Sequence, residues 1–140
     1  MKIIIDTNVA LDVLLNRTEF LQSSHNILKL SAQDRVEGFL TTNTITDMFY
    51  VLHKNSKDAL KSRQAIAQLI KLVTLEAVVP SDISLALASN IIDLEDAVVC
   101  FAAKRIKADY IVTRNTTDFI NSPVPAITPV DFMDKFFRDT

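Results

Sequence analysis

Four short runs of apolar residues recur along this chain, and longer helix-like segments separate each run from the next. The runs cover residues 2–5, 38–40, 75–79 and 110–112. Because their side chains are mostly apolar rather than alternately polar, they are typical of strands that are covered on both faces. Parallel strands need long crossover connections, which helices provide. The sequence therefore predicts a three-layer α/β/α fold around a central, mainly parallel sheet of four to five strands.

The segments between these runs carry apolar residues at the spacing of amphipathic helices. Two of them follow the i, i+3, i+4, i+7 rule, at Ile45, Met48, Phe49 and Leu52 and at Ile66, Leu69, Ile70 and Val73. Further helices are expected over residues 9–15, 21–34, 83–90, 93–106 and 129–137, with a loop over residues 113–125. No linker or repeat interrupts this order, and a length of 140 residues suits a single domain spanning residues 1–140.

Composition narrows the possible classes of function. Gly38 is the only glycine, which excludes a P-loop or a dinucleotide-binding turn, since both need several glycines around a phosphate. Cys100 is the only cysteine and cannot form an internal disulfide, so a cytoplasmic protein is expected. No stretch approaches the ~20 apolar residues of a membrane span, and no membrane partner is expected. The net charge of −2 does not by itself favour nucleic-acid binding.

Acidic residues lie at the positions where such a fold binds small molecules or ions. In open parallel sheets, ligands bind beyond the carboxyl ends of the strands. Asp6 follows the first run directly, and Asp118 follows the run 110–112 by a few residues. Asp93 and Asp96 share one face at the start of a helix, and Asp47 lies in the first turn of another. Gathered carboxylates repel one another without a cation, so the pattern predicts Mg²⁺ or Mn²⁺, which can activate water for phosphodiester cleavage.

Each aspartate also has a simpler interpretation. Asp6 and Asp93 are each suited to cap the helix that follows. Asp47 is suited to complement a helix dipole, or to form a capping box with the threonine three residues before it. Asp118 is suited to begin a turn. Asp96 is harder to explain in this way, because it opens a helix that is apolar nearly all round, where a carboxylate needs a partner.

Three motifs in this order resemble the PIN domain family. They are Ile-Ile-Asp-Thr-Asn at residues 4–8, Asp-Leu-Glu-Asp-Ala at residues 93–97 and Thr-Arg-Asn-Thr-Thr-Asp-Phe at residues 113–119. The resemblance covers essentially the whole chain and implies a metal-dependent endoribonuclease with an acidic pocket for Mg²⁺ or Mn²⁺. Many small members are the ribonuclease toxins of VapBC-type toxin–antitoxin pairs. This implies RNA, a second copy in a homodimer and an antitoxin protein as partners.

The resemblance also assigns roles to individual residues. Asp6 and Asp96 would be the principal metal ligands, and Asp118 would complete the pocket. Asp47 would be the fourth catalytic acid, where the family commonly has a glutamate. The expected supporting residues are Thr7, Asn8, Asp93, Thr113 and Asn115. Arg114 stands next to the pocket and is the expected RNA phosphate contact, because guanidinium groups pair well with phosphate.

Three other classes of protein compete with this interpretation. A haloacid-dehalogenase-type phosphatase needs a second aspartate two residues after the first, where this chain has Asn8. A response-regulator receiver needs an acidic pair after the first strand, where only Asp6 is found. A PIN-like nucleic-acid-binding or scaffold module with weak or no catalysis stays open, and the aspartate at position 47 and the acidic net charge favour it.

Overall fold

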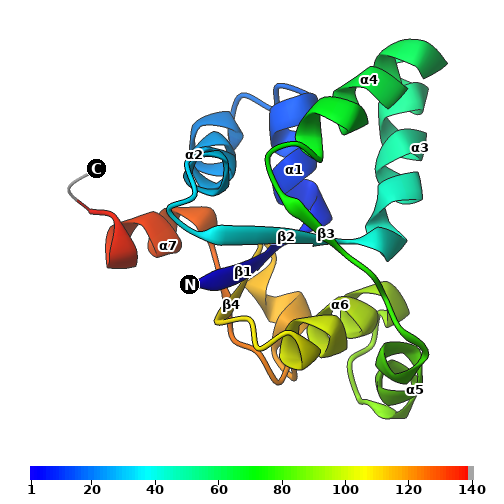
Figure 1. Cartoon of the computed structure of the whole chain (residues 1–140), viewed down its shortest axis with the longest axis vertical. Helices are drawn as coiled ribbons and strands as arrows, with labels where there is room; N and C mark the ends of the chain where they lie inside the picture. Colours follow the sequence, from blue (N-terminus) through cyan, green and yellow to red (C-terminus); the bar gives the residue numbers. More distant parts are fainter. Residues whose placement is uncertain (139–140) are drawn as a thin grey trace.

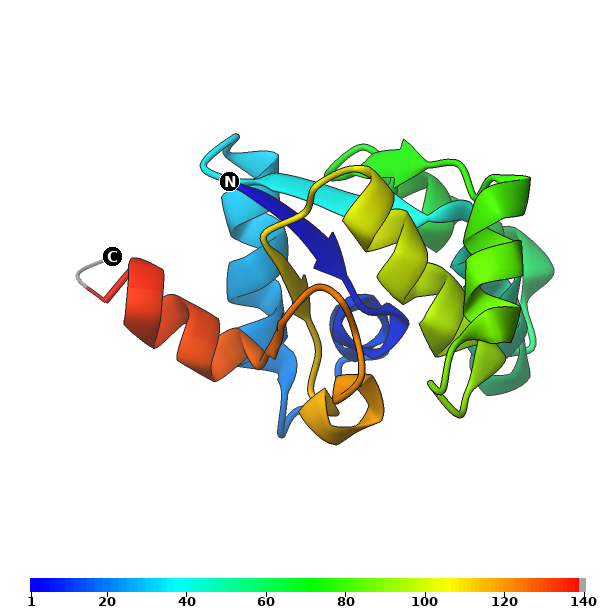
Figure 2. The ribbon, with the colours of Figure 1, turned by 90° about the horizontal axis from the view of Figure 1, so that it is seen from below.

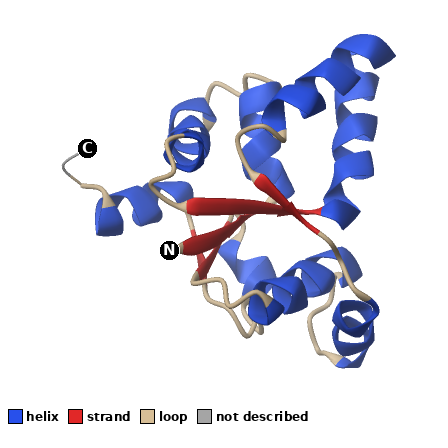
Figure 3. Cartoon of the chain, viewed as in Figure 1, coloured by secondary structure: helices blue, strands red, loops and turns tan. Residues whose placement is uncertain are grey.

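All five strands of the central sheet run parallel in the computed structural model, which describes residues 1–138 (Figures 1 and 3). In spatial order they are β3 (Thr74–Glu76), β2 (Glu37–Thr41), β1 (Lys2–Ile5), β4 (Tyr110–Val112) and β5 (Ala126–Ile127). The first three strands proceed toward one edge of the sheet and the last two toward the other. The order therefore switches direction between β1 and β4, and the predicted parallel α/β/α sheet is confirmed.

The helices form one layer on each face of the sheet, as Figure 1 shows. One layer holds α1 (Thr7–Leu14), α2 (Leu21–Ala32), α3 (Ile45–Ser56), α4 (Ala59–Leu69) and α7 (Pro129–Phe136). The other holds α5 (Pro80–Ala88) and α6 (Leu94–Arg105). Right-handed crossovers explain this division, because the chain must cross the opposite face when it returns from β3 to β4. No helix within residues 1–138 is long and apolar enough to cross a membrane.

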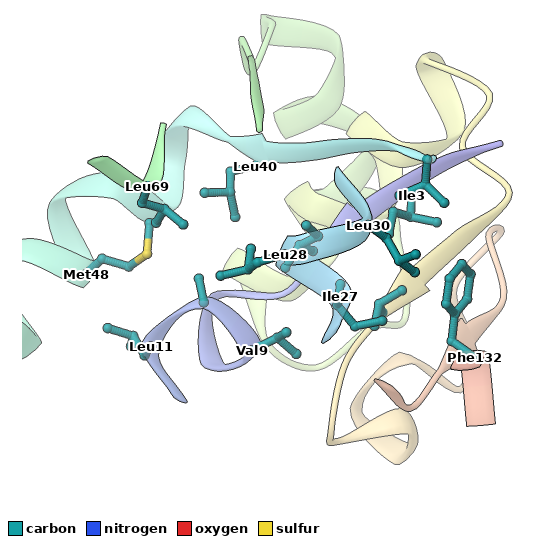
Figure 4. Packing of buried hydrophobic residues seen from close by; sticks show 14 of the residues in the cluster. Ile3, Val9, Leu11, Ile27, Leu28, Leu30, Leu40, Met48, Leu69 and Phe132 are labelled. Atoms are coloured by element: carbon teal, nitrogen blue, oxygen red, sulfur yellow. The ribbon is translucent and has the colours of Figure 1, made fainter. Parts of the chain in front are cut away.

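The side chains of β1 point alternately into the two apolar cores. Ile3 and Ile5 pack with α1, α2 and the other helices of the larger layer, whereas Ile4 packs with α6 on the opposite face. This follows from the strand geometry, in which successive side chains point to opposite faces. Figure 4 shows the larger core, where Ile3 lies near Ile27 and Leu30 of α2, and Phe132 of α7 closes one end. The buried sheet fixes the carboxyl ends of β1 and β4 side by side.

Three elements differ from the sequence-based predictions. β3 ends at Glu76 and not at residue 79, because the Val78 amide donates to the Thr42 hydroxyl (3.2 Å) instead of joining the ladder. β5 was not predicted as a separate strand, since two residues give no periodicity signal. α4 ends at Leu69, so Val73 of the predicted apolar stripe lies outside the helix while still packing on the core.

Candidate metal centre

Asp6 and Thr113 meet where β1 and β4 end side by side. The Asp6 backbone N–H continues the ladder by donating to the Val112 carbonyl (2.9 Å), and the Thr113 hydroxyl donates to Asp6 Oδ2 (2.8 Å). Thr113 is fully buried, so this hydrogen bond holds the Asp6 carboxylate in one orientation. The Asp6 side chain makes no capping hydrogen bond to α1. Asp6 thus occupies the N-cap position of α1 without the side-chain bond that a cap normally makes, and its carboxylate faces the switch point of the sheet.

The start of α6 brings further carboxylates to this edge. Asp93 caps the helix, because its Oδ1 accepts from the Asp96 backbone N–H (2.9 Å), as the simpler interpretation predicts. A pocket of about 340 Å³ is lined by Asp93, Asp96 and Asp118 together with Ile92 and Ile120. Asp118 comes from the short 3₁₀ helix η2 (Thr116–Phe119). Figure 2 shows η2, the start of α6 and the end of β1 around the start of α1.

The pKa values of two carboxylates at this edge, those of Asp6 and Asp96, are raised. Burial raises the pKa of Asp6, and the charge of Asp118 adds to the rise, although hydrogen bonds from Thr113 and the Thr7 backbone oppose it. Burial also raises the pKa of Asp96 to about 7, with further contributions from the charges of Asp93, Asp6 and Asp118. These effects show that the three predicted ligands, Asp6, Asp96 and Asp118, share one electrostatic environment.

Asp47 belongs to this edge through a residue that the sequence analysis missed. Asp47 is exposed in the first turn of α3, and the expected capping box is absent, because the Thr44 hydroxyl donates to the Thr41 carbonyl (2.9 Å). Instead Asp47 hydrogen-bonds Glu95 of α6. Burial, followed by this hydrogen bond and the charge of Asp47, raises the pKa of Glu95 to about 8. Glu95 could have been predicted from its position within the acidic motif of residues 93–97.

Arg114 is held by a buried carboxylate on the other side of the switch point. Its Nε donates to Asp12 Oδ2 (2.8 Å) and its Nη2 to Asp12 Oδ1 (3.2 Å). Its guanidinium carbon also lies 3.9 Å from the centre of the Phe20 ring. Asp12 was missed by the sequence analysis, although a lone acid between Leu11 and Val13 of an apolar helix calls for a partner. The expected phosphate contact is thus already engaged in an ion pair.

The remaining supporting residues lie in the same region. Thr7 and Asn8 form the first turn of α1 and are half-buried. The Asn115 backbone N–H donates to the Thr113 hydroxyl (3.0 Å), which orients that hydroxyl toward Asp6. Asn43, at the carboxyl end of β2, carries the only buried side-chain oxygen or nitrogen atom in residues 1–138 without a hydrogen-bond partner. Its Oδ1 is a free acceptor at the same edge of the sheet.

The donor set fits a hard divalent cation in its chemistry. All the acidic groups at this edge offer carboxylate oxygen, which Mg²⁺ and Mn²⁺ prefer. As the side chains stand, however, no group of three or more His, Cys, Asp or Glu residues within 1–138 is arranged to hold a metal ion. Asp96 is half-buried and Asp118 is exposed, so both side chains have room to change rotamer. Three-carboxylate binding therefore requires these side chains to move toward Asp6.

Comparison with solved structures supports the fold. A chain of the VapBC-1 structure from nontypeable Haemophilus influenzae matches with a TM-score of 0.71 and 16% identity, over 93% of this chain and 99% of that chain. A chain of VapBC2 from Rickettsia felis, bound to a promoter DNA fragment, matches with a TM-score of 0.70 and 15% identity, over 91% and 98%. A chain of a toxin–antitoxin complex from Klebsiella pneumoniae matches with a TM-score of 0.66 and 19% identity, over 90% and 96%.

Comparison by sequence finds a family model but no curated relative. A family model described as PIN domain matches residues 2–117, which include Asp6, Asp47, Asp96 and Thr113. This match covers most of the chain and agrees with the resemblance carried by its three motifs. The chain therefore belongs to the PIN domain family.

Proposed function

We propose that this protein is an endoribonuclease that uses Mg²⁺ or Mn²⁺. The observation that carries the proposal is that Asp96 and Asp118 line one pocket near the switch point of a parallel sheet, where Asp6 follows β1 and accepts a hydrogen bond from Thr113. Carboxylates with raised pKa values, such as Asp6 and Asp96, destabilise the folded chain unless a cation or protons neutralise them. Such an arrangement is easier to explain as a metal site than as a structural feature.

The residues of the site divide into ligands and supports. Asp6, Asp96 and Asp118 would hold the metal, and Thr113 and Asn115 would fix the orientation of the Asp6 carboxylate. A bound metal would lower the pKa of a water molecule and stabilise negative charge on the scissile phosphate. The Glu95 carboxyl, with its pKa of about 8, holds a proton at neutral pH beside Asp47.

Partners follow from the same site and from the family. Arg114 is proposed to contact an RNA phosphate through Nη1, because Nε and Nη2 are engaged with Asp12 and the described residues offer Nη1 no hydrogen bond. The similar solved structures are described as VapBC or toxin–antitoxin complexes. We therefore propose that this chain is the toxin of such a pair, with an antitoxin protein as partner, and that it forms a homodimer.

A second candidate function rests on the absence of a ready-made metal site within residues 1–138. A PIN-like module that binds nucleic acid or a protein without cleaving RNA would not need the carboxylates to close on an ion. Its acidic groups would still repel one another when ionised. Protonation of Asp96, whose pKa is raised to about 7, relieves this repulsion at moderate pH. The two functions differ in their response to metal.

Manganese titration combined with RNA cleavage separates the two candidates. The wild-type protein should bind Mn²⁺ in calorimetry and cleave a mixed RNA substrate only when Mn²⁺ or Mg²⁺ is present. Asp6→Asn and Asp96→Asn should each remove both properties. Asp134→Asn is the matched control, because Asp134 is an exposed aspartate on α7, away from the carboxyl edge. Wild-type protein that shows no metal-stimulated cleavage would support the binding module instead.

A further inference from the structure

Asp12 lies at the centre of a buried polar cluster between α1 and α2. Its side chain is fully buried and accepts hydrogen bonds from Ser24 Oγ (2.9 Å), Arg17 Nη1 (3.3 Å) and two nitrogen atoms of Arg114. Arg17 and Ser24 lie close to Asp12 in sequence, whereas Arg114 comes from the loop after β4. A buried carboxylate with this many donors is firmly placed. It therefore fixes the position of Arg114 from outside the acidic pocket.

Arg114 also lies within electrostatic reach of the acidic pocket. It directly follows Thr113, whose hydroxyl bonds Asp6, and its positive charge acts on the Asp6 carboxylate. A guanidinium group released from its partner would be attracted to the nearest cluster of carboxylates. Here the carboxylate that already feels the charge of Arg114 is Asp6, and the charges of Asp6 and Asp118 both act on Asp96. An arginine placed among them would occupy the position and neutralise the charge that a divalent cation needs.

We infer that Asp12 is a positioning residue that keeps the guanidinium of Arg114 out of the acidic pocket and so leaves the pocket free for a metal ion. Side-on pairing through Nε and Nη2 satisfies the charge of Arg114 locally. Stacking on Phe20 covers one face of the guanidinium and further restricts its movement. The inference rests on the proposed metal-dependent function, but it concerns residues that lie outside the set of metal ligands.

A purely structural role for Asp12 makes a different prediction. If Asp12 only anchored the loop after β4 to α1, it would do so through Arg114, and Arg114→Met would weaken metal binding as much as Asp12→Asn does. If Asp12 keeps Arg114 away from the metal, the effect of its replacement on metal affinity should disappear when Arg114 is also replaced. A double-mutant cycle on metal binding distinguishes these two roles.

The experiment measures Mn²⁺ affinity by calorimetry in full-length variants. Asp12→Asn keeps an acceptor for Ser24 and should weaken Mn²⁺ binding about tenfold, the lower end of the range for residues that support metal ligands. Arg114→Met should bind Mn²⁺ at least as tightly as wild type, and the double variant should match Arg114→Met. Arg17→Met is the control, because it removes a cation from Asp12 without releasing Arg114. A double variant as weak as Asp12→Asn would overturn the inference, as would an unchanged affinity in Asp12→Asn.

A second measurement needs no metal and so separates this inference from the proposed function. In metal-free Asp12→Asn, the NMR signal of the Arg114 Nε–H group should shift when Asp118→Asn is added, because the released guanidinium then faces the pocket. In the wild-type background, the same Asp118→Asn change should leave that signal in place. A signal that is insensitive to Asp118 in both backgrounds would refute the inference, even if the protein bound Mn²⁺. Wild-type protein that binds no Mn²⁺ would count against the metal site instead.

Discussion

Replacing Asp96 with asparagine should make the metal-free protein more stable at about pH 8 while removing its affinity for metal. Burial and the neighbouring acids raise the pKa of Asp96 from its usual 3.8 to about 7. The folded chain then binds a proton more tightly than the unfolded chain. The stability that this group contributes is therefore present at about pH 4 and is lost as the pH rises through 7. Asparagine cannot ionise, so the variant avoids that loss.

The size of the effect follows from the pKa rise and from what opposes it. At about 1.4 kcal/mol for each pKa unit, the rise corresponds to at most ~4 kcal/mol. Asp96 is only half-buried, and solvent screening reduces this to about 1–2 kcal/mol. The substitution also loses a favourable charge in the first turn of α6, which is worth about 0.5 kcal/mol. The net gain is about 1 kcal/mol, or about 3–5 °C in Tm for a domain of this size.

Thermal unfolding of the metal-free variants at two pH values tests this reasoning. Asp96→Asn should unfold at a higher temperature than wild type at about pH 8, and the difference should vanish near pH 4. Asp134→Asn, on the exposed surface of α7, should show no such dependence. Adding Mn²⁺ at about pH 8 should stabilise wild type and leave Asp96→Asn unchanged. The reasoning fails if metal-free Asp96→Asn is no more stable than wild type at about pH 8.

Three further predictions concern pH, an ion pair and the single glycine. Manganese affinity should rise between about pH 6 and pH 8 in calorimetry, because the Asp96 carboxyl, with its pKa of about 7, must lose its proton before a cation is held; a flat profile would contradict this. Arg105→Met should lower the free energy of unfolding by about 3 kcal/mol in urea titration, because it leaves the buried Asp82 carboxylate without its cation, and it should not alter metal affinity. Gly38→Ala should cost about 1–3 kcal/mol in the same assay, because the new Cβ would lie 2.5 Å from the Ser31 hydroxyl oxygen; the same change should cost much less in a Ser31→Gly background, which itself lacks the Ser31 hydrogen bond to the Leu72 carbonyl.

The sheet could be predicted from sequence because its inner strands carry unusually clear signals. Ile3, Ile4 and Ile5 are buried on both faces, and this leaves a continuous apolar run in the sequence. β5 has no comparable signal, because Ala126 and Ile127 join the sheet only through pairing with β4. The predicted end of β3 was wrong for a similar reason. It is decided by a hydrogen bond between Val78 and Thr42, which lies far away in the sequence.

The site could be predicted only in part, because sequence identifies acids more readily than their partners. Asp6 and Asp96 follow from their place at a strand end and at a helix start, and both lie at the switch point. The pairing of Arg114 with Asp12 joins positions 102 residues apart, and no local pattern reveals it. Glu95 was overlooked because its neighbour Asp96 fitted the motif. Electrostatic partners depend on the tertiary fold, which brings together elements that are separated along the chain.

The short outer strands of the sheet bear on how this protein behaves at high concentration. β3 has three residues and β5 has two, and the strands between them, β2, β1 and β4, have five, four and three. An exposed strand edge offers unpaired backbone groups that can recruit a strand from another molecule, and short edges offer few of them. The isoleucine run of β1 has the composition of an aggregation-prone segment, but in the folded chain it is paired on both sides. Aggregation is therefore expected to begin from unfolded chains that expose this run, so its rate should follow the unfolded population.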